Sequence, residues 1–357
     1  MSSVLGEKIK LSVFGESHGR AIGCVIDGLP AGVKLDFDLI QKEMDKRAPG
    51  RDKTSTTRKE PDTPQILSGV LNGATTGAPL AMIIENTNTR SGDYDSLRLV
   101  PRPGHSDYPA YVKYKGANDI RGGGHFSGRL TAPLVFAGAV AKQILAAKGV
   151  TVGAHILQIG PVRDTAFDKN TITAAMLSEL SSDFFATIST EKEIEMRAAI
   201  ENARLQSDSV GGVIECAAVG LPVGIGSNMF STVEGRLSYA LFGIPAVKGV
   251  QFGAGFDFAG MRGSEANDPY AVKDGKVCLK SNNNGGVLGG MTDGAPLVFS
   301  VVIKPTASIA AAQDSVNLAT MENEKLVVKG RHDPCIVPRA VAVVEAVCAF
   351  TLLDMMM

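Results

Sequence analysis

The sequence GVLNGATTGAPL at residues 69–80 recurs as GVLGGMTDGAPL at residues 286–297, with nine of the twelve positions identical. Each copy leads into an apolar segment, residues 81–85 and 298–303, which is typical of a buried strand. Repetition of so long a segment indicates a duplicated unit rather than two unrelated turns. We therefore expect one internal duplication in the chain.

A second pair of segments supports this duplication. Gly23-Cys24-Val25-Ile26 leads to Gly28-Leu29-Pro30, as Gly212-Val213-Ile214 leads to Gly220-Leu221-Pro222, and helix-like stretches follow at residues 36–46 and 232–242. No low-complexity linker separates the copies. We expect a single domain over residues 1–357, with pseudo-repeats at about 8–150 and 205–357 and a charged helical connection at residues 190–204.

Each predicted repeat ends in a long apolar segment that follows a polar loop. The first runs from Pro133 to Lys148 and Gly149, and the second follows Pro338 and covers residues 340–353. Proline in a first turn and glycine after the last are typical of helix ends. Because both segments are apolar nearly all round, we expect helices buried between sheets. The predicted fold class is α+β: a β-α-β sandwich with internal pseudo-twofold duplication and helices buried between antiparallel sheets.

The composition argues against several classes of function. The 357 residues include 36 basic and 37 acidic side chains, no Trp and 6% aromatics, so neither nucleic acid nor anionic lipid is an indicated partner. The five cysteines are scattered, without a C-x-x-C pair, as is typical of reduced thiols. Residues 1–10 hold no apolar signal segment, and no apolar run is long enough to cross a bilayer. We expect a cytoplasmic protein that binds neither nucleic acid nor membranes.

Four of the five histidines lie in glycine-rich or polar loops. These are His18, His105, His125 and His332, whereas His155 lies in an apolar strand. The reference pKa of histidine is about 6.5, which makes it the usual proton donor of neutral-pH chemistry. For each one alone, a structural role in loop hydrogen bonding is an equal alternative. Four such loops in one chain favour a site.

Arginines accompany the same loops. A guanidinium group pairs bidentately with phosphate or carboxylate. Arg129 and Arg339 each stand at the start of an apolar helix, where unpaired backbone N–H groups attract anions, so we predict two oxyanion cradles. An exposed, solubilising role is the better interpretation of Arg51 and Arg58. The other arginines near these loops are Arg47, Arg102, Arg121 and Arg331.

Several familiar signatures are missing from the sequence. Gly122-Gly123-Gly124 does not follow the dinucleotide pattern G-x-G-x-x-G, and neither a P-loop nor a G-x-S-x-G nucleophile elbow is present. His105-x-Asp107 and His332-Asp333 have no H-E-x-x-H motif or cysteine cluster beside them. We therefore predict no metal site.

Six motifs, in order along about residues 11–353, resemble those of the chorismate synthase family. They are Phe14-Gly15-Glu16-Ser17-His18-Gly19, Arg102-Pro103-Gly104-His105-Ser106-Asp107, Arg121-Gly122-Gly123-Gly124, residues 285–290, Lys304-Pro305-Thr306-Ala307-Ser308 and Gly330-Arg331-His332-Asp333-Pro334-Cys335. The resemblance implies a homotetrameric lyase of aromatic amino acid biosynthesis that requires reduced FMN. Its reaction would be the anti-1,4-elimination of phosphate from 5-enolpyruvylshikimate 3-phosphate to give chorismate.

The same resemblance implies roles for individual residues. His105 would be the acid near the leaving phosphate, His18 would lie by the reduced flavin, and Asp333 would assist proton removal through the flavin. The substrate anions would be held by Arg47, Arg102, Arg129 and Arg339. The FMN contacts would be His125, Phe126, Ser127, Pro245, Ala246, Gly289, Lys304, Pro305, Thr306, Ala307, Ser308 and Arg331. In members that reduce their own flavin, NADPH is linked with Arg47 and Lys53.

The chain departs from the common pattern of the family at two of these places. His125 and Phe126 stand where many members have arginine and serine, and Pro245 stands where asparagine is frequent. Proline has no N–H, so a flavin contact at Pro245 would use its carbonyl.

Two other classes of function remain open from the sequence. One is a flavoprotein oxidoreductase that transfers hydride to a small anionic acceptor. The other is a non-catalytic anion-binding protein, in which His18 and His105 are structural. The sequence also leaves open whether NADPH reduces the flavin on this protein or reduced FMN is supplied from outside.

Overall fold

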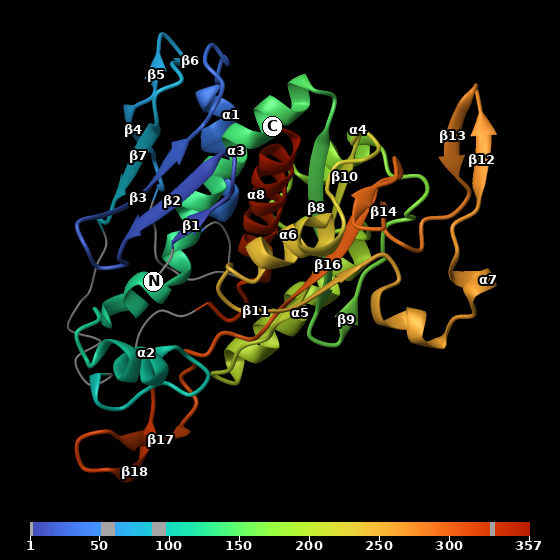
Figure 1. Ribbon diagram of the computed structural model, residues 1–357. Helices are drawn as coiled ribbons and strands as arrows, with labels where there is room; N and C mark the ends of the chain where they lie inside the picture. The colour runs from blue at the N-terminus through green and yellow to red at the C-terminus, as the bar shows by residue number, and fades with distance from the viewer. Residues whose placement is uncertain (1–2, 51–60, 88–97, 329–332) are drawn as a thin grey trace.

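The computed structural model describes residues 3–50, 61–87, 98–328 and 333–357. Two five-stranded sheets, with antiparallel pairing throughout, face each other across a layer of helices (Figure 1). Across the first sheet the strands are β1 (Val4–Leu5), β2 (Lys10–Gly15), β3 (Ala21–Asp27), β7 (Leu80–Glu85) and β4 (Gln65–Ser68). Across the second they are β11 (Val247–Phe252), β16 (Leu297–Ile303), β10 (Gly212–Val219), β8 (Thr151–Ile159) and β9 (Val162–Arg163).

Two long helices fill the space between the sheets. α3 (Thr131–Ala147) and α8 (Val337–Met356) pack against each other, α3 against β3 and α8 against β8 and β10 (Figure 1). The helices approach so closely that a Cβ atom on Gly138 would lie 2.2 Å from the Cα of Ala346. This arrangement confirms the predicted α+β fold with helices buried between antiparallel sheets.

The buried helix pair also contains charged side chains, although its sequence is mostly apolar. Lys142 of α3 donates to Glu345 of α8, and at 2.9 Å to Glu43. Glu345 is 1% exposed, and it also accepts from the Ser181 hydroxyl at 2.7 Å and the Ala154 N–H at 2.9 Å. By length and hydropathy the segment Gly128–Ala147 could span a membrane, yet 72% of it is buried inside the protein, which is the setting of a core helix.

The repeated sequences fold into the same local unit. β5 (Val70–Leu71) and β6 (Ala74–Thr75) form a hairpin that leads to β7, and β14 (Val287–Leu288) and β15 (Met291–Thr292) form one that leads to β16. In each unit a threonine hydroxyl of the hairpin donates to a proline carbonyl at 2.6 Å, Thr75 to Pro30 and Thr292 to Pro222. The duplication therefore preserves hydrogen bonds as well as sequence.

The helices after β3 and β10 also correspond. α1 (Phe37–Arg47) is capped by the Asp36 side chain and α6 (Val233–Leu241) by the Thr232 side chain, each accepting from a backbone N–H of the first turn. The predicted charged connection is α5 (Thr190–Leu205). The other helices and hairpin strands are α2 (Asp107–Tyr114), α4 (Ala174–Leu180), α7 (Gly263–Ala266), β12 (Tyr270–Lys273), β13 (Lys276–Leu279), β17 (Gln313–Asn317) and β18 (Glu322–Leu326).

Candidate active site

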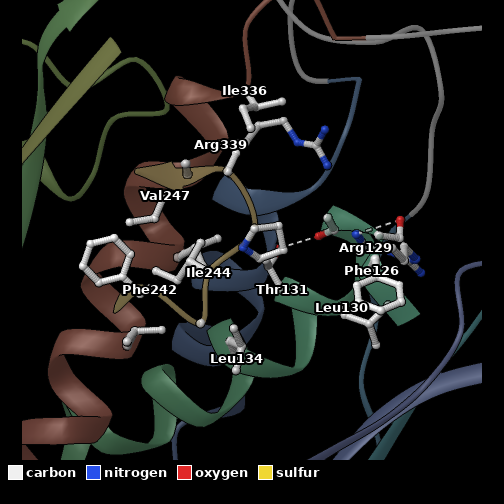
Figure 2. Close-up of a pocket in the computed structure, with 18 of the residues that line it drawn as sticks. Phe126, Arg129, Leu130, Thr131, Leu134, Phe242, Ile244, Val247, Ile336 and Arg339 are labelled. Atoms are coloured by element: carbon white, nitrogen blue, oxygen red, sulfur yellow. Dashed lines mark hydrogen bonds between the residues drawn. The ribbon is translucent and has the colours of Figure 1, made fainter. Parts of the chain in front are cut away.

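A cavity of about 1010 Å³ lies where the first turns of α3 and α8 meet the end of α1 and the loop between α6 and β11. Figure 2 shows Phe242, Ile244 and Val247 on one side of it and Phe126, Arg129 and Leu130 on the other. Small-molecule pockets usually measure roughly 300–1,000 Å³. The cavity therefore has room for more than one small ligand, with an apolar wall opposite a cationic one.

Three arginines reach the cationic side of the cavity from three elements. Arg47 ends α1, Arg129 precedes α3 in a 3₁₀ turn, η3 (Gly128–Leu130), and Arg339 lies in the first turn of α8. Arg339 donates from NH1 to Asp333 at 2.6 Å and from Nε to the carbonyl of Arg47 at 2.9 Å. Both predicted helix-start arginines thus line one cavity.

Asp62 joins two of these arginines. Its Oδ2 accepts from NH1 of Arg47 at 2.5 Å, and its Oδ1 accepts from NH1 of Arg129. Burial raises the pKa of Asp62, but the charges of Arg47 and Arg129 outweigh it and bring that pKa below its ordinary value. Burial lowers the pKa of Arg47 to about 10, although Asp62 opposes the shift. Both groups are therefore charged at neutral pH.

His105 lines the cavity from the loop before α2, and its side chain is 20% exposed. Its Nδ1 lies 2.6 Å from Oδ1 of Asp107, whose Oδ2 accepts from Nε of Arg102 at 2.7 Å. Burial raises the pKa of Asp107, but hydrogen bonds from Arg102 and His105 hold it well below its usual range. Since this carboxylate can only accept, Nδ1 donates to it, and Nε2 is left to exchange a proton.

The Gly122–Gly124 loop lies between two histidines, and at Gly122 there is no room for a side chain. All three glycines have positive φ, at 60°, 85° and 55°. A Cβ atom on Gly122 would lie 2.6 Å from Cδ2 of His18, and one on Gly123 would lie 3.5 Å from Nε2 of His105. His18 therefore packs against this loop and is not among the described residues that line the cavity.

His125 faces the cavity with both ring nitrogens already bonded to protein. Nδ1 lies 2.7 Å from the carbonyl of Gly15, to which it must donate, and Nε2 lies 2.8 Å from the hydroxyl of Ser3. Phe126 and Ser127 line the cavity beside it. A ligand contact at His125 would thus use the face or edge of the ring rather than a free nitrogen.

Two lysines and a threonine form a further polar part of the wall. Lys304 donates to the carbonyl of Gly104 at 2.5 Å, and burial together with the nearby charge of Lys248 lowers its pKa. Lys248 is the extra residue of a β-bulge between β11 and β16. Thr306 has a buried hydroxyl oxygen with no hydrogen-bond partner among the residues that the structure describes. A phosphate group would offer acceptors to all three.

The other predicted site residues lie at the cavity, behind His105, or elsewhere in the chain. Pro245, Ala246, Pro305 and Ala307 line the cavity. Arg102 and Ser308 lie behind His105, where Arg102 donates to Ser308 at 3.1 Å, so Arg102 supports the histidine instead of facing a ligand. Gly289 lies in the turn between β14 and β15, outside the described lining of the cavity. Lys53 and Arg331 lie outside the described residues.

The sequence analysis missed many residues of the site, among them three that bear on its chemistry. Lys248 and Tyr239 line the cavity, and Asp62 binds two of its arginines. Lys248 follows Pro245 and Ala246 closely in the chain, which is a usable signal. Asp62 lies in no motif, and only the folded chain brings it to Arg47 and Arg129.

Comparison with known proteins decides the family. The chorismate synthase family model matches residues 9–357. The chain belongs to the chorismate synthase family. Chorismate synthases of Korarchaeum cryptofilum and Thermococcus kodakarensis are 48% and 47% identical to it, covering 99% and 98% of this chain and 97% and 96% of theirs. A chorismate synthase crystal structure superposes with a TM-score of 0.77 at 28% identity, covering 98% of this chain and 91% of that one.

The chorismate synthase match confirms the resemblance read from the six motifs. It extends from β2 to the end of α8, so every element that borders the cavity except the short β1 segment lies within the matched residues. The likeness in structure also confirms the α+β fold.

Proposed function

We propose that this protein catalyses the anti-1,4-elimination of phosphate from 5-enolpyruvylshikimate 3-phosphate to give chorismate, with reduced FMN bound in the same cavity. The observation that carries the proposal is the convergence of Arg47, Arg129 and Arg339 with the His105–Asp107 pair on one cavity. The substrate carries two carboxylates and a phosphate, and paired guanidinium groups suit all three.

The residues present fit a flavin mononucleotide. Lys304, Lys248 and the hydroxyl of Thr306, which has no partner within the described part of the chain, suit its phosphate. The apolar wall with Leu134, Ile244 and Val247 suits its ring. When bound and reduced, FMN supplies electron density to the breaking C–O bond. Pro245 and Ala246 lie at the same wall, where the carbonyl of Ala246 already accepts from the N–H of Lys304 at 2.9 Å.

Side chains of the protein would bind the anionic groups of the ester and transfer the protons. Arg47, Arg129 and Arg339 hold the ester's anions against the first turns of α3 and α8. His105 donates a proton from Nε2 to the departing phosphate, while Asp107 stabilises the imidazolium form. Asp333, paired with Arg339 at 2.6 Å, assists removal of the C6 proton. His18 acts from behind the glycine loop, by holding it in place.

An anaerobic assay tests the proposal. The protein is mixed with the ester and chemically reduced FMN, and phosphate and chorismate are measured. We expect equal amounts of both, with flavin in catalytic amount and no net oxidation. Consumption of one reduced flavin or nicotinamide per turnover would instead indicate an oxidoreductase, and binding without phosphate release would indicate a non-catalytic anion-binding protein. Repeating the assay with NADPH and oxidised FMN tests whether the protein reduces its own flavin.

We also propose a cytoplasmic homotetramer. All five cysteines are free and four are buried, which suits a reducing compartment. Phe230 is 93% and Phe256 86% exposed, and both side chains are available for contact with another chain. Light scattering of the purified protein should give four times the chain mass of 37.3 kDa. A monomeric mass at micromolar concentration would refute the assembly.

A further inference from the structure

Asp62 is a buried carboxylate on the far side of two cavity arginines. Arg47 and Arg129 line the cavity, whereas Asp62 is 1% exposed and is not among the described residues that line it. Its two oxygens are divided between the two guanidinium groups, one on each. The carboxylate therefore binds both arginines on the side that faces away from the cavity.

Neutral groups also accept hydrogen bonds from these two arginines. Arg47 donates from Nε to the Thr131 hydroxyl at 3.1 Å and from NH2 to the Gly128 carbonyl at 3.0 Å. Arg129 donates from Nε to Oδ1 of Asn86 at 3.2 Å. Such bonds direct the guanidinium groups but do not offset their mutual repulsion, which also lowers the pKa of Arg47. Asp62 supplies the negative charge between them.

The backbone of Asp62 is held in an uncommon conformation. Its φ is 46°, in the left-handed region that few residues other than glycine adopt. Such a conformation persists only where the surroundings fix it. The ion pairs to Arg47 and Arg129 hold the side chain of this residue.

We propose that Asp62 is the positioning residue of the substrate's anion site, fixing the spacing and orientation of Arg47 and Arg129 so that an incoming carboxylate or phosphate meets preset donors. The inference rests on the proposed function, because the anion in question is that of the enolpyruvyl ester. Asp62 touches no substrate and moves no proton. Its effect is therefore on binding, not on the chemical step.

The test separates KM from kcat. In Asp62→Asn, which keeps the shape and removes the charge, KM for the ester should rise roughly 10-fold or more while kcat stays within about threefold. Asp62→Glu keeps the charge but moves it by one methylene group. Its KM should lie between those of wild type and Asp62→Asn, at least about threefold above wild type. If the Asn variant does not fold, a wild-type KM in the Glu variant overturns the proposal.

A matched control and a second probe complete the experiment. Asp164 is 6% exposed and its Oδ2 accepts from the N–H of Ile188 at 2.6 Å; neither residue is among the described residues that line the cavity, so Asp164→Asn should lower the melting temperature without changing KM. Inorganic phosphate binding is measured by calorimetry on wild type and Asp62→Asn, and does not depend on turnover. Roughly tenfold weaker phosphate binding by the variant supports the role of Asp62 even if the ester is not turned over. A folded Asn variant with wild-type phosphate affinity and KM overturns it.

Discussion

His105 owes its orientation to two residues behind it. Asp107 accepts a hydrogen bond from Nδ1, and Arg102 donates to Asp107 from Nε at 2.7 Å and from NH2 at 2.8 Å. The resemblance implied that Arg102 binds substrate, yet Arg102 donates to Asp107 and Ser308 and is not among the described residues that line the cavity. The reason is local, because Asp107 begins α2 five residues later and its carboxylate also accepts the backbone N–H of Arg102 at 3.0 Å.

Replacing His105 tests its part in proton transfer. His105→Ala should lower kcat by about 10²-fold or more, the usual scale for lost acid–base help, with KM little changed. Asp107→Asn should lower it less, because the imidazole remains but loses the anion that fixes its tautomer. Steady-state phosphate release under argon measures both. Rates within twofold of wild type in His105→Ala would remove His105 from the mechanism.

The pair of helices α3 and α8 determines where two of the arginines lie. Their packing brings the first turn of α8, with Arg339, and the turn before α3, with Arg129, to one cavity. The sequence predicted both helices and both arginines because helix ends are marked by nearby residues. It did not predict the Lys142–Glu345 pair, since two charges far apart in an apolar pattern carry no sign of their contact.

Gly138 tests how closely the two helices must pack. Gly138→Ala places its Cβ 2.2 Å from the backbone of Ala346, and such overpacking usually costs about 1–3 kcal/mol. We expect a lower melting temperature and weaker ester binding, because the first turns of α3 and α8 separate. Gly263→Ala is the control, since a Cβ there meets nothing within 4 Å. Equal stability of the two variants would contradict the close packing.

The Lys142–Glu345 pair predicts how stability depends on pH. Burial raises the pKa of Glu345, but the charges of Lys142 and Lys46 bring it down to about 2. A carboxyl group with a lowered folded pKa stabilises the protein fully above its unfolded pKa of about 4.3, and this stability is lost as pH falls toward 2. Glu345→Gln should therefore cost about 3 kcal/mol near pH 7.

Urea unfolding of wild type and Glu345→Gln across pH 2–7 measures this dependence. The difference between their free energies of unfolding should be constant above pH 5 and shrink below it. A difference that stays constant from pH 7 down to pH 2 would show that folding does not lower the pKa of Glu345.

At the scale of the whole molecule, the duplication made most of the architecture predictable. The repeated Gly-Val-Leu and Gly-Ala-Pro-Leu patterns predict local turns, and both copies fold alike, down to the bonds from Thr75 and Thr292. The site was predictable where its residues lie in such patterns, as at His105 and Lys304. Asp62 and Tyr239 could not be placed, because contacts between distant segments leave no local signal in the sequence.

The central claim is that the ester and the flavin share one cavity, and a difference spectrum tests it most directly. Oxidised FMN is bound to the protein and the ester is added, with wild type and Arg339→Ala compared. We predict a change in the flavin absorbance that saturates at one ester per chain. In Arg339→Ala, FMN should still bind, but the ester concentration needed for the change should rise at least about tenfold. An ester that binds without altering the flavin spectrum, or equally well without Arg339, would contradict the shared cavity.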